Sequence, residues 1–565
     1  MEPATLDTTC DYLILGGGSA GCVLASRLSE IASAKVVLVE AGHEPGSGAD
    51  GAVVQDARVR TMGNPRLFWP NLTAAYSRSG PSLPLLAARV LGGGSAINGM
   101  HALRGLQSDY DEWRQLGVIG WGWDDVLPFF KKLEADCDFH GEDHGRDGPL
   151  SLKRIGSDRW SGLSRAIAAA LDGQGIHEIA DLNVDQGDGY GAVPLNANGA
   201  RRQSAADAYL TAQVRARANL SIRTGTTGRR LLFDGRRVVG AEVEQDGRLA
   251  TIRAGETIVC MGAIHSPAFL LNSGIGPAAD LAAAGVPVVA DRSGVGANLI
   301  NHPFLTIGAH LKREGRQTRA VPHPCPMLVR YSSNVPGCPP TDMMLDVWER
   351  TPNQLDRDPL AAQVANLMIL LNKVYSTGWV RIGPSGGLNV NFNFLSDQRD
   401  MDRMIGSLHF VMNLLKAQPV AGLINRSFFP NYASPLVFKL MQNDWQAQIL
   451  SIAGAIGLSG PVMLRDHILA KAGRDVNEVI EDPDAVRAQV AQSTLAGGHS
   501  AGTCRMGDPG QDGTVTDSRC RVVGVEALRV ADTSIFPTLM AAGTNIPVMM
   551  AAEKTARMIN EDRRS

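Results

Sequence analysis

Cys10-Asp11-Tyr12-Leu13-Ile14-Leu15-Gly16-Gly17-Gly18-Ser19-Ala20-Gly21 runs from an apolar segment directly into a glycine-rich turn. The apolar run 12–15 predicts a buried parallel strand. Residues 19–31 carry apolar side chains on one side of a predicted helix, and the β-branched segment 35–40 predicts a second strand. This order of strand, turn, helix and strand predicts a βαβ unit, which is the context that a dinucleotide fingerprint requires.

The glycines of this turn have the G-x-G-x-x-G spacing of a dinucleotide-binding loop. Gly16 permits the tight turn, Gly18 lets the backbone approach a pyrophosphate, and Gly21 lets helix and strand pack closely. The start of the helix supplies free N–H groups and positive potential for phosphates. Glu40 lies 40 − 21 = 19 residues past the last glycine, where a carboxylate can accept hydrogen bonds from a ribose.

Length and composition indicate a soluble globular protein of more than one domain. The 565 residues exceed one small core, so two intimately joined domains are expected. A net charge of −3 offers no basic field for nucleic acid. The eight cysteines include no C-x-x-C pair, so no metal site is expected, and their scatter is typical of a reducing compartment.

The chain carries no basic segment followed by an apolar core at its start, which predicts a cytoplasmic protein without a secretory signal. Residues 448–464 are uncharged, but this stretch is short for a span of ~20 residues, and Gly460-Pro461 interrupts it. A buried or lid helix is the favoured interpretation. An interfacial surface with weak membrane association stays open.

Other segments indicate how the rest of the chain is organised. Leu91-Gly92-Gly93-Gly94-Ser95 is a second glycine-rich turn. A run of strands is predicted between 220 and 260, at 220–223, 229–233, 238–244, 250–253 and 257–260. The block 303–490 mixes short strand candidates, at 379–382 and 388–392, with helical stretches. From about residue 495 the sequence is again rich in glycine.

Two long segments carry a resemblance to a known family. The first is Ala88-Arg89-Val90-Leu91-Gly92-Gly93-Gly94-Ser95-Ala96-Ile97-Asn98, which continues through Ala102 and Gly105 to Asp111. The second is Gly262-Ala263-Ile264-His265-Ser266-Pro267-Ala268-Phe269-Leu270-Leu271-Asn272-Ser273-Gly274-Ile275-Gly276, in which Phe269 replaces the usual aliphatic residue. With these segments the chain resembles the glucose–methanol–choline (GMC) oxidoreductases, which are FAD enzymes. The resemblance runs from about Asp11 to Ile559.

The resemblance implies an α/β fold, α+β overall, in which a Rossmann-like FAD-binding domain joins a substrate domain with an antiparallel sheet and helices. We assign residues 1–150, 215–302 and 495–565 to the FAD-binding domain. Residues 151–214 and 303–494 are assigned to the substrate-binding domain. Segments 68–72, 376–379 and 394–397 are especially similar to the 5-hydroxymethylfurfural oxidase branch, which acts on furanic and benzylic primary alcohols.

The family pattern and the fingerprint together predict a set of FAD contacts. The predicted cofactor-binding residues are Gly16, Gly18, Ser19, Ala20, Gly21, Glu40, Ala41, Trp69, Arg89, Gly93, Asn98, Gly99, Met100, Ala102, Asp532 and Asn545. Some family members attach FAD covalently through a histidine just before the signature asparagine. Ile97 occupies that position and has no nucleophile, so FAD is expected to be non-covalent. In the segment 298–303, Asn301 stands where family members often have an aspartate.

His499 and Asn545 are the predicted catalytic pair. Oxidising an alcohol removes the hydroxyl proton and a hydride from the same carbon, and the flavin N5 takes the hydride. A histidine with the reference pKa of ~6.5 is largely neutral at pH 7 and can take the proton. Asn545 can donate its amide to the alcohol oxygen and orient it. The two positions match the His-Asn form of the family pattern.

These features predict FAD-dependent oxidation of a primary alcohol on an aromatic, furanic or otherwise apolar group. Oxygen or a quinone or dye would reoxidise the flavin, and the oligomeric state stays open. One alternative is a lyase of the same family, of the hydroxynitrile lyase or photodecarboxylase type. Another is an NAD(P)-linked dehydrogenase, which would explain the first glycine motif but not the presence of the motif at 89–102.

Overall fold

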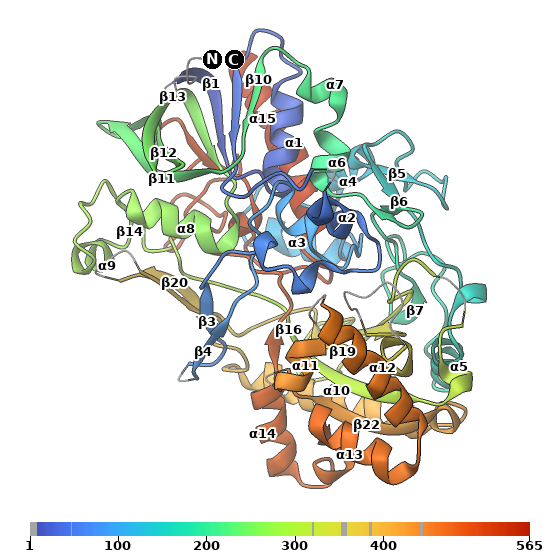
Figure 1. The fold of residues 1–565 in the computed structure, drawn as a ribbon. Coiled ribbons are helices and arrows are strands. Elements are labelled where there is room, and N and C mark those ends of the chain that lie inside the picture. The colour runs from blue at the N-terminus through green and yellow to red at the C-terminus, as the bar shows by residue number, and fades with distance from the viewer. Residues whose placement is uncertain are drawn as a thin grey trace.

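The computed structural model describes residues 8–46, 48–78, 80–318, 321–351, 359–383, 387–432, 434–440 and 444–564. Figure 1 shows two large sheets, one above the other, with helices packed around each. The N-terminal strand and the C-terminal helix lie together in the upper part, so the two ends of the chain build the same layer (Figure 1).

The upper sheet grows from the predicted βαβ unit. Its parallel part pairs strands in the order β10 (Leu220–Arg223), β2 (Val36–Val39), β1 (Thr8–Leu15) and β13 (Arg248–Val259), with β25 (Leu528–Val530) beside the end of β13. Two antiparallel strands, β12 (Arg237–Gln245) and β11 (Thr226–Asp234), extend it. The last four residues of β1 and all of β2 are buried, because helices cover the parallel part of the sheet.

Several predicted element boundaries differ from the structure, and two of the differences have a clear local cause. Helix α1 (Ser19–Leu28) ends three residues before Ile31, where the Ser29 hydroxyl donates to the carbonyl of Ser26 and the chain turns. The strands predicted at 250–253 and 257–260 are one strand, β13. Gly255 interrupts the pattern of side chains, but its backbone passes close to that of Asp11 and the pairing with β1 continues.

The lower sheet is antiparallel. Its strands follow the order β23 (Gly473–Asp475), β22 (Ile424–Pro430), β16 (Pro303–Leu311), β19 (Val364–Leu371), β18 (Met343–Trp348), β17 (Met327–Tyr331) and β7 (Gly189–Ala192). Helix α10 (Gln398–Lys416) packs against β19, and α5 (Gly162–Asp172) and α14 (Pro483–Ser493) pack against α10. The predicted strands at 379–382 and 388–392 form a hairpin, β20 (Trp379–Ile382) and β21 (Leu388–Asn391).

The proposed division into two domains stays a prediction, and two short elements lie close to its boundaries. Helix α6 (Ala205–Tyr209) packs against α1 of the upper layer. Strand β24 (Leu495–Ala496) pairs with β16 of the lower sheet. Each of these two elements therefore packs against the layer to which the predicted boundaries did not assign it.

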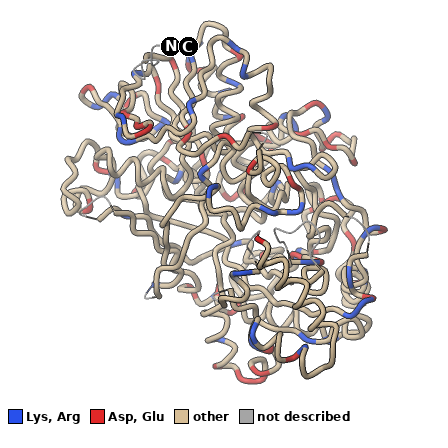
Figure 2. The backbone as a smooth tube through the Cα atoms, in the orientation of Figure 1, with Lys and Arg blue, Asp and Glu red and all other residues tan. Residues whose placement is uncertain are grey.

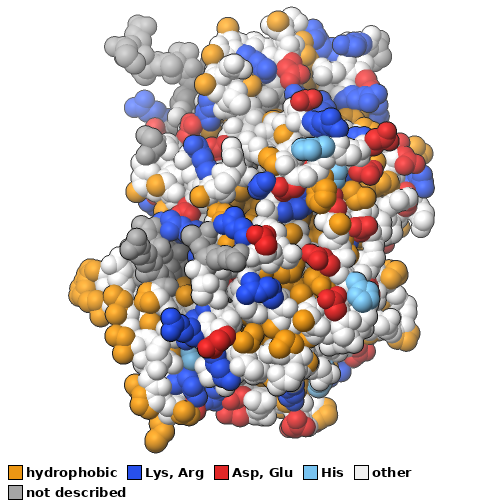
Figure 3. Space-filling model, turned by 90° about the vertical axis from the view of Figure 1, so that its right-hand side faces the viewer, with side chains coloured by type: hydrophobic (Ala, Val, Ile, Leu, Met, Phe, Trp, Pro, Cys, Tyr) orange, Lys and Arg blue, Asp and Glu red, His pale blue; other side chains and the backbone are white. Residues whose placement is uncertain are grey.

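The uncharged stretch 448–464 forms two helices, α12 (Trp445–Ser459) and α13 (Val462–Ala472), which break at Gly460-Pro461. Within the described ranges, the structure has no helix that is both long and apolar enough to cross a membrane. Lysines, arginines and acidic residues are scattered over the whole backbone (Figure 2), and both signs are interspersed on the face shown in Figure 3.

A buried ionic cluster ties α10 to the lower sheet. Arg403, Asp342 and Asp400 have fully buried side chains, and the Arg403 guanidinium contacts Asp342 at 3.2 Å and Asp400 at 2.5 Å. Asp400 also accepts the backbone N–H groups of Tyr375 and Ser376. The cluster therefore holds the segment that follows β19 in place.

We expect Arg403→Leu to lower the free energy of unfolding by about 3–5 kcal/mol, because it leaves two buried carboxylates without their cation. Urea unfolding followed by circular dichroism measures the effect. The matched control is Arg487→Leu, which removes a half-exposed guanidinium near Asp402 and should leave the midpoint almost unchanged. Equal midpoints for both variants would contradict a stabilising role for the cluster.

Candidate active site

The fingerprint glycines lie at the end of β1, and each has a different environment. Gly16 has a φ of +107°, and a Cβ there would lie 2.4 Å from the carbonyl oxygen of Cys260. A Cβ on Gly21 would lie 1.9 Å from the carbonyl oxygen of Gly16. A Cβ on Gly18 would meet nothing nearer than 3.9 Å. The first and third glycines thus allow close packing, whereas the second borders free space that a ligand can approach.

The second glycine-rich turn packs directly on the first. The backbone N–H of Gly92 donates to the carbonyl of Gly17 at 2.8 Å. Gly93 has a φ of +53°, and a Cβ there would lie 2.6 Å from the Cα of Gly18. Two segments that are 75 residues apart in the chain (93 − 18) therefore form one glycine-lined wall.

Backbone donors and one carboxylate frame this wall. Gly18 is the N-cap of α1 and offers no side chain, so the N–H groups of the first turn stay available to a ligand. The Glu40 carboxylate accepts the N–H groups of Gly17 at 2.8 Å and Gly42 at 2.7 Å. Burial raises the pKa of Glu40, and the two backbone hydrogen bonds oppose that rise.

A cavity of about 2490 Å³ lies between the two sheets and is lined by most of the predicted site. The predicted residues on its wall are Gly16, Gly18, Ser19, Ala20, Glu40, Ala41, Trp69, Gly93, Asn98, Gly99, Met100, His499, Asp532 and Asn545. Gly21, Arg89 and Ala102 are not part of the wall.

These three residues have other contacts. Gly21 packs against Gly16, as described above. Ala102 is fully buried, and its N–H donates to the carbonyl of Pro194 at 2.7 Å. The Arg89 guanidinium lies over the ring of Trp69, 5.1 Å from its centroid, so Arg89 reaches the cavity wall through that ring.

Asp532 connects several segments of the cavity wall through hydrogen bonds. Its carboxylate accepts hydrogen bonds from the Ser266 hydroxyl and from the N–H groups of Gly262 and Ser534, both at 2.8 Å. Gly262 begins helix α8 (Gly262–Asn272), so Asp532 holds the start of this helix against the cavity.

A chain of hydrogen bonds sets the protonation of the predicted base. His302 is fully buried, and its Nε2 lies 3.0 Å from the carbonyl oxygen of Asn372. Since a carbonyl only accepts, we assign the proton of His302 to Nε2 from this contact. Its Nδ1 lies 2.9 Å from Nδ1 of His499 and accepts from it. With this assignment, His499 carries its proton on Nδ1 and keeps a lone pair on Nε2.

The Nε2 atom of His499 faces Gly543, where a Cβ would lie only 3.2 Å away, and the His499 side chain lines the cavity. Burial and the neighbouring His101 lower the pKa of His499 to about 4. Burial, with a smaller effect of His499, holds the pKa of His302 well below its usual range. Both rings are neutral at pH 7, which is the state that a proton acceptor needs.

Asn545 is the first residue of α15 (Asn545–Arg564) and meets the start of α1. The Ser19 hydroxyl donates to Oδ1 of Asn545 at 2.8 Å. The Nδ2 atom is buried and has no hydrogen-bond partner in the described structure. A buried amide without an acceptor is costly, so Nδ2 is poised to donate to an oxygen or a cofactor atom in the cavity.

Sequence reasoning did not select two residues that shape this site, His302 and Asn372. The motif Asn301-His302-Pro303 could have pointed to His302. The contribution of Asn372 could not be read from the sequence, because any residue can supply a backbone carbonyl. Asn301 also contributes, since its Oδ1 accepts the backbone N–H of His499 at 2.9 Å.

Comparison with known proteins gives matches over nearly the whole chain. Family models described as GMC oxidoreductase match residues 10–304 and 375–552. The chain is 35% identical over 569 residues to 5-(hydroxymethyl)furfural oxidase from Methylovorus sp. (strain MP688), covering 98% of this chain and 99% of that protein. It is 30% identical to the oxygen-dependent choline dehydrogenase of Photobacterium profundum, covering 98% and 93%.

A solved structure, pyridoxine 4-oxidase from Mesorbium loti, superposes with a TM-score of 0.80 at 28% identity, covering 98% of this chain and 99% of that one. The matched models span both glycine turns, the His499 segment and Asn545. The predicted fold, a mixed helix and sheet architecture of the GMC type, is thus confirmed, and the protein is an oxidoreductase that acts on CH–OH donors. The chain belongs to the GMC oxidoreductase family.

Proposed function

We propose that this protein binds FAD non-covalently and oxidises primary alcohols on aromatic, furanic or otherwise apolar groups to aldehydes, with His499 as the base. The observation that carries the proposal is the hydrogen-bond chain through His302, which leaves a lone pair on His499 Nε2 at the cavity wall. The resemblance of the whole chain to alcohol oxidoreductases supports it.

The residues of the cavity fit FAD. The space beside Gly18, the uncapped start of α1 and the carboxylate of Glu40 suit a pyrophosphate and a ribose. When bound, FAD supplies the acceptor for the hydride that leaves the carbinol carbon. Ile97, on the cavity wall, offers no nucleophile for a covalent link.

The chain's own residues then handle the proton and the oxygen. His499 Nε2 takes the hydroxyl proton of the alcohol, and Asn545 Nδ2 donates to the same oxygen as negative charge develops on it. Ser19 fixes the direction of the Asn545 amide, and His302 fixes the tautomer of His499. His302 is thus a positioning residue.

The lining of the cavity supports an apolar substrate. Strands of the lower sheet present Phe304, Met344, Trp348 and Phe428 to it, and helices α11 (Pro435–Leu440), α12 and α13 close the opposite side with leucines and valine. The outer sides of α12 and α13 are also apolar, and their exposed residues include Trp445, Ile449, Ile452, Ile456 and Met463. Such a surface favours the approach of apolar alcohols.

We expect His499→Ala to slow anaerobic reduction of the bound FAD by benzyl alcohol about 10²-fold or more, because the variant lacks the base that takes the hydroxyl proton. Stopped-flow absorbance at the flavin band measures the rate, and the FAD content should stay unchanged. The control His409→Ala removes an exposed imidazole on α10 and should reduce at the normal rate. A normal rate for His499→Ala would remove it from the chemistry.

The pH dependence of the same reaction should reflect the lowered pKa of His499. The imidazole becomes protonated, and the base is lost, only as the pH falls through about 4. The apparent second-order rate constant with benzyl alcohol should therefore stay level from about pH 8 down to about pH 5.5. A histidine at the ordinary pKa of ~6.5 would lose about tenfold at the lower pH, and such a loss would argue against this assignment.

Acid precipitation of the yellow holoenzyme should release all of its flavin into the supernatant, because Ile97 replaces the nucleophile that a covalent link needs. The absorbance of supernatant and pellet gives the distribution directly. Flavin that stays with the washed, unfolded protein would show a covalent bond at another residue.

A further inference from the structure

One acidic residue stands on an otherwise apolar part of the cavity wall. Alternate residues of β18, which are Met344, Asp346 and Trp348, face the cavity. In the sheet, Asp346 pairs with Met368 on β19 and Leu328 on β17. The Asp346 side chain is buried, with 5% of the residue exposed. A carboxylate is an unfavourable choice for such a position unless a ligand or partner compensates its charge.

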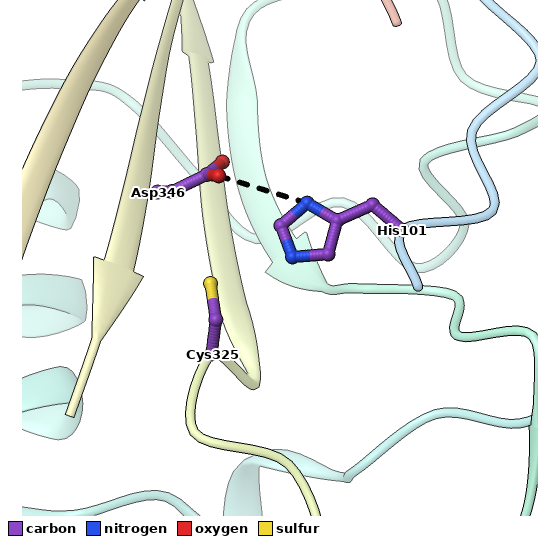
Figure 4. A group of neighbouring side chains, drawn as sticks. All are labelled: His101, Cys325 and Asp346. Carbon is purple, nitrogen blue, oxygen red and sulfur yellow. Dashed lines mark ion pairs between the residues drawn. The ribbon is translucent and has the colours of Figure 1, made fainter. Parts of the chain in front are cut away.

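The protein supplies no cation for Asp346 among the contacts of the described residues. Its nearest ionisable partner is His101, with Nδ1 3.6 Å from Oδ2 (Figure 4). Burial lowers the pKa of His101 to about 4, so this ring is neutral at pH 7. Arg426 also lines the cavity, but it pairs with Asp475 at 2.7 Å.

Two polar atoms of this pair stay without a hydrogen bond. Oδ1 of Asp346 and Nε2 of His101 are both buried and have no partner in the described structure. Burial raises the pKa of Asp346 to about 7, and the neighbouring Trp348 indole opposes that rise only in part. Both atoms can accept hydrogen bonds, so a ligand with several donors would satisfy them.

The pair lies within reach of a molecule that contacts His499. His101 directly follows the Gly99-Met100 turn and is near enough to His499 to lower its pKa. Asp346 is on β18 and is level with Met368 of β19 and, one strand further, with Thr306 of β16, so it lies two strands and three residues away from Pro303. Two strand spacings and the three-residue offset, roughly 10 Å each, separate the two backbones by about 14 Å. The His101 ring, which contacts Asp346 and lowers the pKa of His499, lies between them and places both ends within reach of one para-substituted ring.

We propose that Asp346, with His101 beside it, forms a subsite for a hydrogen-bond-donating group, above all an ammonium, at the end of the substrate remote from the reacting carbinol. The inference rests on the proposed alcohol oxidation and narrows its substrates to alcohols with a second polar end, either an amine or a hydroxyl. An ammonium would pair with the carboxylate in a site of low dielectric constant, where such a contact is strong.

A metal ion is the competing occupant of this place. The ligand atoms of His101, Asp346 and Cys325 all lie within 4.8 Å of one another (Figure 4). However, Cys325 is not part of the cavity wall, its thiol donates to the carbonyl of Met327 at 3.6 Å, and burial raises its pKa well above the usual range. The geometry therefore favours an organic donor over a metal.

The first test measures binding without turnover. Isothermal titration of the FAD-loaded protein with benzylamine at pH 8 should show binding that Asp346→Asn weakens about tenfold or more. Asparagine has the size of aspartate and removes an unpaired buried charge, so the variant should fold. Glu478→Gln is the matched control, since Glu478 is an exposed carboxylate that also lines the cavity, and its affinity should be unchanged.

The second test uses three benzyl alcohols that differ only in the para group, which is aminomethyl, hydroxymethyl or ethyl. Anaerobic flavin reduction by the aminomethyl compound should lose about tenfold in apparent second-order rate constant in Asp346→Asn, while the ethyl compound keeps its rate. A smaller loss for the hydroxymethyl compound would identify the subsite as one for both donors.

The outcomes separate the subsite from the proposed function. Benzylamine binding that depends on Asp346, with no alcohol reducing the flavin, would keep the subsite and reject alcohol oxidation. Alcohol oxidation with equal affinities and equal rate ratios in Asp346→Asn would reject the subsite alone. Stoichiometric metal in the purified protein that Cys325→Ser removes would also overturn the subsite and assign the cluster to a metal.

Discussion

The hydrogen bond between the two imidazoles of His499 and His302 is the contact on which the proposed chemistry of this site depends. It requires the segment after β24 to lie against the start of β16, and it requires the Asn372 carbonyl at the end of β19 to fix the proton of His302. The Arg403 cluster under α10 secures that same region through the backbone of residues 375–376. The availability of the lone pair on His499 Nε2 thus depends on how β16, β19 and α10 of the lower sheet pack together.

The cofactor side of the cavity depends on backbone rather than side chains. The two glycine turns are in contact at Gly18 and Gly93, and a Cβ on Gly93 would lie too close to the Cα of Gly18 for this contact to form. Two helices, α1 and α15, begin at this place, and the contact between Ser19 and Asn545 joins their first residues. Helix starts present N–H groups and positive potential, so this end of the cavity suits phosphate and the electron-rich atoms of a flavin.

The substrate side follows the opposite principle, because strands of the lower sheet present apolar side chains such as Phe304, Met344 and Trp348 to the cavity. In such a setting each unpaired polar group has a large effect on specificity. Asn545 and the Asp346–His101 pair are separate unpaired groups on the wall. In the proposed reaction, Asn545 contacts the reacting end of the substrate, and the Asp346–His101 pair distinguishes substrates by their remote end.

The sequence by itself determined the βαβ unit, both glycine turns and the family, because these depend on short motifs whose spacing is fixed by local geometry. It also selected His499 and Asn545 as candidates, and the structure places both on the wall of one cavity. The sequence placed the strand at 220–223 correctly, whereas it did not give the end of α1, the start of β1 at Thr8 or the continuation of β13 through Gly255. Tertiary structure alone decided which nitrogen of His499 is free, since that depends on a backbone carbonyl 127 residues away (499 − 372). It alone also revealed the isolation of Asp346, because a strand pattern gives the side that a residue faces but not the partners it lacks.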